Sequence, residues 1–306
     1  LSKIAYPRQG MATTNNERFL RQWYEVRVSS IKFDGTSEND TLLGWKWFPY
    51  NKGGSFRKWS GNNDYIVNFQ NKGKEICDYI DSHSAVNHKG RVINRDKYFQ
   101  PSVTWSKISG GDVSFRYKTI GHVFDVAGTS IFGDSYTLDY MIGLLNSKVV
   151  KDILSCLSPT LNYEVGHICS IPVIESKNQT ILDIVQQNIS ISKSDWDAHE
   201  TSWDFTSNEL LSIDTDSYES IMHDFADYHQ ISIDLEPTEP SKLSWRVDIY
   251  KKKWETMFLR LHQNEETLNE KFIHIYSLEN ELTPDVPLDE VTILQQGEIS
   301  IEKEKT

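Results

Sequence analysis

Cysteine is scarce in this sequence of 306 residues, and long apolar runs are missing from it. The three cysteines cannot form a disulfide framework, and no two of them have a C-x-x-C spacing, which favours a reducing compartment such as the cytoplasm and argues against a structural zinc site. No apolar run approaches the roughly 20 residues of a membrane-spanning helix, and no signal-peptide core opens the chain. We therefore expect no membrane partner. The composition, with 38% hydrophobic and 25% charged residues, is typical of a globular protein.

Catalytic motifs are missing as well. The sequence contains no G-x-G-x-x-G, no G-x-x-x-x-G-K-[ST], no H-E-x-x-H and no G-x-S-x-G. His83 and His88 are five positions apart, which fits neither one face of a helix nor a usual pair of metal ligands. We therefore predict no catalytic residue and no metal site in this chain, and no cofactor of its own.

The net charge of −12 conceals an uneven distribution. Residues 1–150 hold 20 Lys and Arg against 14 Asp and Glu, a net charge of +6, whereas residues 151–306 hold 12 against 30, a net charge of −18. A phosphate backbone would be attracted to the first half and repelled by the second. The plain alternative is that the acidic half only keeps a large protein soluble.

Apolar periodicity predicts an α+β fold in two parts. A mixed α/β module extends to about residue 175, and an α-helical module follows it. The strands are expected at 65–69, 103–105, 113–117, 122–126 and 171–174. The helices are expected at 17–28, 74–80, 138–157, 179–191, 218–228 and 245–282, the last one broken at Asn264 and Glu265.

One segment, residues 45–65, combines seven aromatic residues with four cations around glycine and asparagine. Asn62 and Asn63 have the amide groups that pair with an adenine edge, and Arg57 and Lys58 can reach guanine or phosphate. This mixture is typical of a nucleic-acid surface. Two alternatives stay open: the rings form core with the cations directed outward, or the loop holds a sugar by stacking.

A second basic cluster lies at 89–97, with four cations in nine residues, among them Arg91, Arg95 and Lys97. Such a loop can follow a phosphate backbone, although an ordinary solvated loop has the same composition. Lys118 flanks a predicted strand and is a weaker candidate.

Several segments resemble the PglX-like adenine-specific DNA methyltransferases of BREX phage-defence systems, which are related to type IIG restriction-modification enzymes. The segment KWFPYNKGGSFRKWSGN at 46–62 carries the most specific resemblance. Further similar segments are TWSKIS at 104–109, LLNSKVV at 144–150, SPTLNYEVG at 158–166, IPV at 171–173, DWD at 195–197, ETSWDF at 200–205, LNE at 268–270 and IY at 275–276.

The resemblance implies a methyltransferase domain, then a target-recognition domain, then helices. This chain has no Asn-Pro-Pro-aromatic motif and begins at Leu1, so we expect it to be the C-terminal part of such a protein, inactive alone. S-adenosylmethionine is implied for the missing catalytic domain. Residues 1–30 would be a connector from that domain, 31–175 the DNA target-recognition domain and 176–306 a helical scaffold.

The 10–20 segment resembles the family's form G-x-x-T-G-D-N-x-R-F. Gly10, Thr13 and Phe19 agree with it, but Thr14 and Asn15 replace the family's glycine and aspartate, so its role as the lining of an adenine pocket competes with that of a plain connector. The agreement extends to Asn16 and Arg18.

The resemblance implies sequence-specific recognition of duplex DNA, with the target adenine flipped into the absent domain. The expected phosphate contacts are Lys52, Lys58, Arg91, Lys97 and Lys118, and the expected base-reading residues are Arg57, Asn62, Asn63 and Arg95. The alternative is an acidic protein-interaction module that assembles the subunits of a defence complex. Other BREX subunits are the further partners that either function implies.

Overall fold

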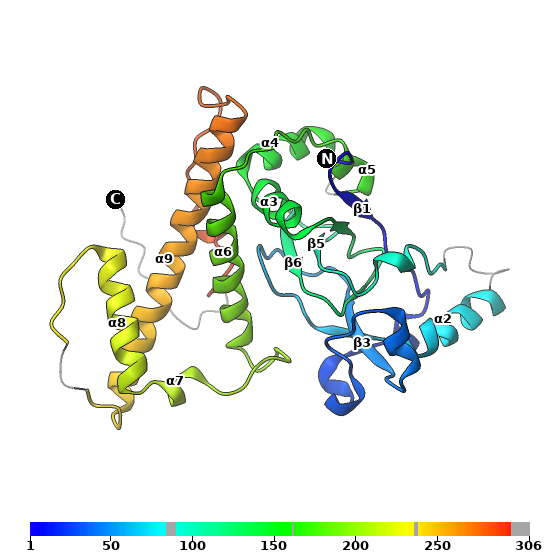
Figure 1. Cartoon of the computed structure of the whole chain (residues 1–306), viewed down its shortest axis with the longest axis horizontal. Coiled ribbons are helices and arrows are strands. Elements are labelled where there is room, and N and C mark those ends of the chain that lie inside the picture. The colour runs from blue at the N-terminus through cyan, green and yellow to red at the C-terminus, as the bar shows by residue number, and fades with distance from the viewer. Residues whose placement is uncertain (84–89, 161, 236–237, 295–306) are drawn as a thin grey trace.

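The computed structural model describes residues 1–83, 90–160, 162–235 and 238–294. Strands and short helices form one side of the molecule, and the long helices α6, α8 and α9 stand beside them (Figure 1). The predicted α+β class, with a helical C-terminal region, is confirmed. The helices are α1 Asn16–Phe19, α2 Gln70–Ser82, α3 Ser135–Leu145, α4 Lys148–Leu157, α5 Val165–Cys169, α6 Gln179–Asp197, α7 Glu209–Ser212, α8 Thr215–His229 and α9 Leu243–Ile275.

The first sheet has the strand order β1-β8-β5-β6, and every pair in it is antiparallel. Its central strands are filled by buried side chains such as Val103, Trp105 and Ile131, over which α3 packs. The edge strand β1 lies near the start of the chain. The strands are β1 Tyr6–Arg8, β5 Ser102–Trp105, β6 Phe115–Lys118 and β8 Ser130–Phe132.

The second sheet has the order β2-β4-β3-β7, in which only β3 and β7 are parallel. All five residues of β3 are buried, which explains why its sequence is a nearly continuous apolar run without polar alternation. Phe48 and Tyr50 pack in a cluster with Phe69 and Phe99, so the core-packing alternative is confirmed for these rings. The strands are β2 Leu20–Gln22, β3 Trp47–Asn51, β4 Tyr65–Asn68 and β7 Val123–Phe124.

Two predictions at the edges of these sheets are wrong. The helix expected at 17–28 stops at Phe19, because the next three residues pair with β4 as the strand β2. The strand expected at 171–174 has no ladder, because other groups satisfy its backbone. The N-terminal amino group donates to the Ile171 carbonyl, and the Tyr276 hydroxyl donates to the Pro172 carbonyl.

The long helix expected at 138–157 is two helices, α3 and α4, which meet at Asn146 and Ser147. The Asn146 side chain accepts from the Phe115 amide and donates to the Phe115 carbonyl, both at 3.0 Å. The Lys148 amide, freed at the start of α4, donates to Asn269 of α9 at 2.9 Å. These polar contacts stabilise the break, although the apolar spacing continues across it.

The opposite error occurs in α9, which continues through the break predicted at Asn264 and Glu265 and ends at Ile275 rather than at 282. Glu265 is only 4% exposed, and its carboxylate has buried partners from the other side of the molecule. The polar residue Glu265, which interrupts the apolar periodicity of α9, therefore marks a buried contact.

One apolar core spans the predicted boundary at residue 175. It contains Trp59 and Val103 from the first part, and Val185, Leu261 and Phe272 from the second. The division into 1–30, 31–175 and 176–306 stays a prediction, and the packing couples these segments closely.

Candidate nucleic-acid interface

The loop between β3 and β4, residues 52–64, carries most of the site residues predicted from the sequence. Its central residue Trp59 is fully buried and has a left-handed φ of 69°. The Trp59 amide donates to the Phe115 carbonyl at 2.9 Å and the Trp59 carbonyl accepts from the Tyr117 amide at 2.7 Å. Pairing with β6 thus fixes the loop and gives it an inner and an outer side.

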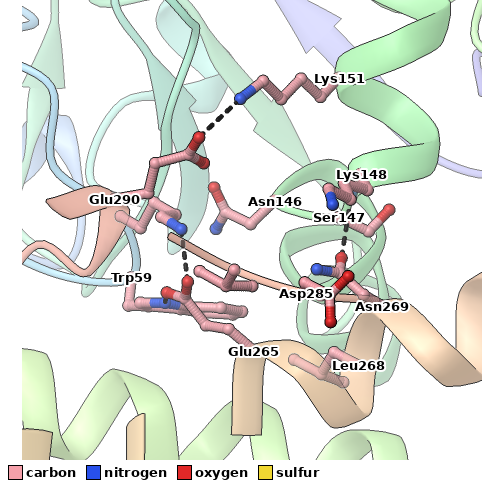
Figure 2. A pocket seen from close by; sticks show the side chains of 13 residues that line it. Trp59, Asn146, Ser147, Lys148, Lys151, Glu265, Leu268, Asn269, Asp285 and Glu290 are labelled. Carbon is pink, nitrogen blue, oxygen red and sulfur yellow. Dashed lines mark hydrogen bonds and ion pairs between the residues drawn. The ribbon is translucent and has the colours of Figure 1, made fainter. Parts of the chain in front are cut away.

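Lys58 lies on the inner side of the loop. Its ammonium group is 2.5 Å from the Glu265 carboxylate, and Trp59 Nε1 donates to the same carboxylate at 2.7 Å. Figure 2 shows Trp59 and Glu265 facing each other beside a cavity of about 30 Å³, which has room for one or two waters. We call Lys58, Trp59 and Glu265 the latch, because they join the loop to α9.

Arg57 also points inward, with only 12% of its side chain exposed. Its guanidinium group donates to the Asp195 carboxylate at 2.9 Å and to the Ser192 carbonyl at 2.8 Å, both on α6. It also lies over the Trp196 ring, 5.1 Å from the centroid. Arg57 therefore has its ionic, hydrogen-bond and aromatic partners within the fold.

Two buried cations of β6 hold the loop from beneath. The Lys118 ammonium donates to the carbonyls of Gly61 and Asn62 at 2.8 and 3.1 Å, and also to the Asn63 side chain. Arg116 donates to the Arg57 carbonyl at 3.1 Å. Burial lowers the pKa of Lys118 well below its usual value and lowers that of Arg116 to about 10.

Asn62 closes the same loop upon itself. It is buried, it has a left-handed φ of 53°, and its side-chain amide donates to the Ser55 carbonyl at 3.0 Å. A Cβ atom at Gly54 would lie 2.5 Å from this amide, so the close approach requires glycine. Of the loop residues predicted to contact DNA, Lys58 and Asn62 are buried, whereas Lys52, Arg57 and Asn63 are partly exposed. Lys52 lies 5.6 Å from the centre of the Tyr65 ring.

The structure brings together Arg91 and Lys97, two other predicted site residues, at the edge strand β1. Arg91 donates to the Gln9 side chain, and Asn94 donates to the Gln9 carbonyl at 2.9 Å. The Lys97 ammonium lies 5.5 Å from the centre of the Tyr6 ring, which is 53% exposed. We define the β1 patch as Tyr6, Arg8, Gln9, Arg91, Asn94 and Lys97.

Tyr6 and Arg8 are members of this patch that sequence reasoning missed. Both side chains are exposed, while Pro7 between them is buried, so they emerge on the same face of the strand. The sequence did contain a signal for them. An aromatic residue and a cation stand on either side of a proline, and proline in a strand is typical of a sheet edge.

Arg95, in contrast, binds residues outside the β1 patch. It lies in η4 (Arg95–Lys97), and its guanidinium group donates to the Glu38 carboxylate at 2.7 Å and to the Lys72 carbonyl. Arg95 thus connects η4 to the neighbouring segments at 38–42 and 72.

A separate cleft of about 350 Å³ lies between the loop and the end of α6. Arg57, Asn62 and Asp64 line one side, and Trp196 and His199 line the other. Desolvation raises the pKa of the Asp64 carboxyl, although Lys118 and Arg116 act in the opposite sense. In the described part of the chain, no three His, Cys, Asp or Glu residues are grouped as metal ligands, and no helix has the length and apolarity to cross a membrane.

Comparison with known proteins gives relatives but no matching family model. The chain is 34% identical over 301 residues to the adenine-specific methyltransferase PglX of Lacticaseibacillus casei (strain Zhang), an alignment that covers 96% of this chain and 23% of that protein. This chain is PglX-like. It is also 37% identical over 196 residues to the adenine-specific methyltransferase BrxX of Escherichia coli O9:H4 (strain HS), covering 63% of this chain and 15% of that one. The PglX-like chain thus spans less than a quarter of either relative.

Proposed function

We propose that this PglX-like chain recognises duplex DNA for an adenine-specific methyltransferase whose catalytic domain lies in the part of the protein that precedes it. The observation that carries the proposal is the alignment with PglX over nearly the whole chain. The β1 patch supports it, because Lys97 lies over the exposed Tyr6 ring and Arg91 binds Gln9, which directly follows the strand in the sequence. S-adenosylmethionine would bind to the catalytic domain, and the protein would act in the cytoplasm in a BREX phage-defence system.

The proposed DNA contacts fall into two groups. Arg8, Arg91 and Lys97 would bind phosphates, with Lys52 as a further phosphate contact, and these contacts would set the position of the duplex. Asn63 is the base-reading candidate on the partly exposed side of the loop.

The inward-facing residues have a positioning role in this proposal. Arg57, Lys58, Asn62 and Lys118 hold the loop in one conformation through their contacts with α6, α9 and β6. Arg95 holds η4 in the same way. A loop that is fixed before binding loses less conformational entropy when DNA binds to it.

The acidic helical part, residues 176–306, would serve as a scaffold against which the loop packs and as a contact for other defence subunits. The alternative, that the whole chain is chiefly an acidic interaction module, also accounts for the charge of residues 151–306. It does not account for the cations and the exposed ring of the β1 patch.

The test is DNA binding by the Arg8→Ala/Arg91→Ala/Lys97→Ala variant, measured over a range of salt concentrations. Each phosphate contact contributes about −0.9 to the slope of log K against log salt, so we expect the slope to become shallower by about two to three. The matched control is the Lys177→Ala/Lys251→Ala/Lys271→Ala variant, which removes the same charge from the helical part. Equal effects of the two triple variants would refute the proposed interface.

A further inference from the structure

An apolar tip lies at the end of η3 (Glu38–Leu42), which Arg95 joins to η4. Leu42 is 53% exposed and the following Leu43 is 72% exposed. A single exposed leucine on a surface is ordinary, but two consecutive ones at the end of a short helix form a protruding apolar surface. We call Leu42 and Leu43 the η3 tip.

The helix that carries the tip is held firmly. Ser37 and Asp40 form a capping box at its start, and the Asp40 carboxylate also accepts from the Thr36 amide at 2.6 Å. Thr41 is fully buried; its hydroxyl donates to the Glu38 carbonyl at 2.6 Å and accepts from the Lys72 amide at 2.9 Å. The two leucines are therefore exposed on a fixed support.

Two exposed lysines belong to segments next to the tip. Lys72 is next to the tip because its backbone amide donates to the Thr41 hydroxyl. Lys46 follows the tip closely in the sequence, two residues after Gly44. Both lysines are exposed. The Lys46 ammonium lies 5.5 Å from the centre of the Trp47 ring, and its charge helps to lower the pKa of the Glu75 carboxyl. Gly44 has a left-handed φ of 96°, and a Cβ atom there would meet nothing within 4 Å, so the end of the tip is open. Exposed leucines with exposed lysines nearby are complementary to a polyanion that has apolar surface between its charges.

The tip is continuous with the β1 patch through η4. Arg95 at one end of η4 binds the Glu38 carboxylate and the Lys72 carbonyl, which support the tip. Lys97 at the other end lies over Tyr6 of the patch. A duplex that lies along the β1 patch would thus reach the η3 tip across a single three-residue helix.

We infer that Leu42 and Leu43 insert between base pairs of duplex DNA bound along the β1 patch, with Lys46 and Lys72 on the adjacent phosphates. This inference rests on the proposed function. Apolar side chains that enter a base step separate the stacked pairs and kink the duplex. A duplex opened in this way has already lost part of the stacking that resists extrusion of an adenine.

The test compares a fully paired duplex with the same duplex carrying one mismatch, because a mismatched step costs less to open. We expect the wild-type chain to bind the mismatched duplex more tightly, and the Leu42→Ala/Leu43→Ala variant to lose this preference. We also expect the variant to bind the paired duplex about tenfold more weakly with an unchanged salt slope, since leucine neutralises no phosphate. Leu211→Ala is the matched control, because Leu211 is also 72% exposed and lies on α7.

The possible results separate this inference from the proposed function. If the wild-type chain does not bind DNA, the proposed function fails, and the inference fails with it. If the wild type binds with steep salt dependence and the double leucine variant keeps both its affinity and its mismatch preference, only the insertion is refuted. A variant that binds both duplexes normally but loses a protein partner would identify the η3 tip as a protein contact, which also overturns the inference.

Discussion

Lys58 and Glu265 are 207 residues apart in the sequence, yet their side chains form a buried ion pair. Two charges removed from water are costly, and the cost is offset only when both are paired and hydrogen-bonded. Here the Glu265 carboxylate receives both the Lys58 ammonium and the Trp59 indole. At the scale of the residue, the latch therefore stabilises one arrangement of the loop against α9.

The latch gives a prediction for stability. Glu265→Gln keeps an acceptor for Trp59 but leaves the Lys58 ammonium buried without an opposite charge. We expect a loss of about 3 kcal/mol in the free energy of unfolding, measured by urea denaturation. Glu270→Gln, on an exposed position of the same helix, is the control and should change this free energy by less than about 0.5 kcal/mol.

A double-mutant cycle isolates the interaction within the latch. Lys58→Met combined with Glu265→Gln removes both charges, so the double variant should be more stable than the sum of the two single effects implies. Strictly additive effects would mean that the two residues do not interact in the folded protein.

Sequence reasoning identified the unusual residues of the 45–65 segment but not their partners. Cations and rings around glycine have the same appearance whether they face DNA or a carboxylate. The carboxylates that bind Arg57 and Lys58 lie on α6 and α9, more than 130 residues further along the chain. Local patterns carry no information about such long-range pairs. Charge reversal at Arg57 or Lys58 would therefore break these buried ion pairs, so it would disturb the fold before it reported on DNA binding.

At the scale of the element, polar residues decide where the helices break. The apolar spacing at 138–157 predicts one helix, but Asn146 binds both backbone groups of Phe115 and ends α3. In α9 a polar pair predicts a break that does not exist, because Glu265 is buried with its own partners. The strands at 65–69, 103–105, 113–117 and 122–126 and the helices at 74–80, 179–191 and 218–228 were predictable, since their periodicity reflects one buried face.

The break between α3 and α4 gives a second prediction. Asn146→Leu removes both bonds to Phe115, and we expect it to lower the free energy of unfolding by about 2 kcal/mol, measured by urea denaturation. Asp152→Ala, on an exposed position of α4, is the control. If Asn146→Leu were neutral or stabilising, the bonds to Phe115 would not be the reason for the break.

At the scale of the whole molecule, the charge separation is visible in the sequence, but the surface that uses it is not. Three cations of the basic first half are buried in the fold and do not contribute to its surface: Lys58, Arg116 and Lys118. The β1 patch gathers its cations from two segments, 6–9 and 91–97. The backbone pairing of Ala12 with Arg91 and the contacts of Gln9 bring these segments together. Sequence reasoning found the second segment and missed the first.

Cross-linking of the chain to duplex DNA, with the cross-linked peptides identified by mass spectrometry, tests the central claim most directly. Photoreactive bases placed along the duplex would mark the residues that touch it. The account predicts cross-links in the peptides that carry Tyr6 and Lys97, and their loss when the salt concentration is raised. Cross-links confined to α8 and α9, or cross-links that persist unchanged at high salt, would contradict it.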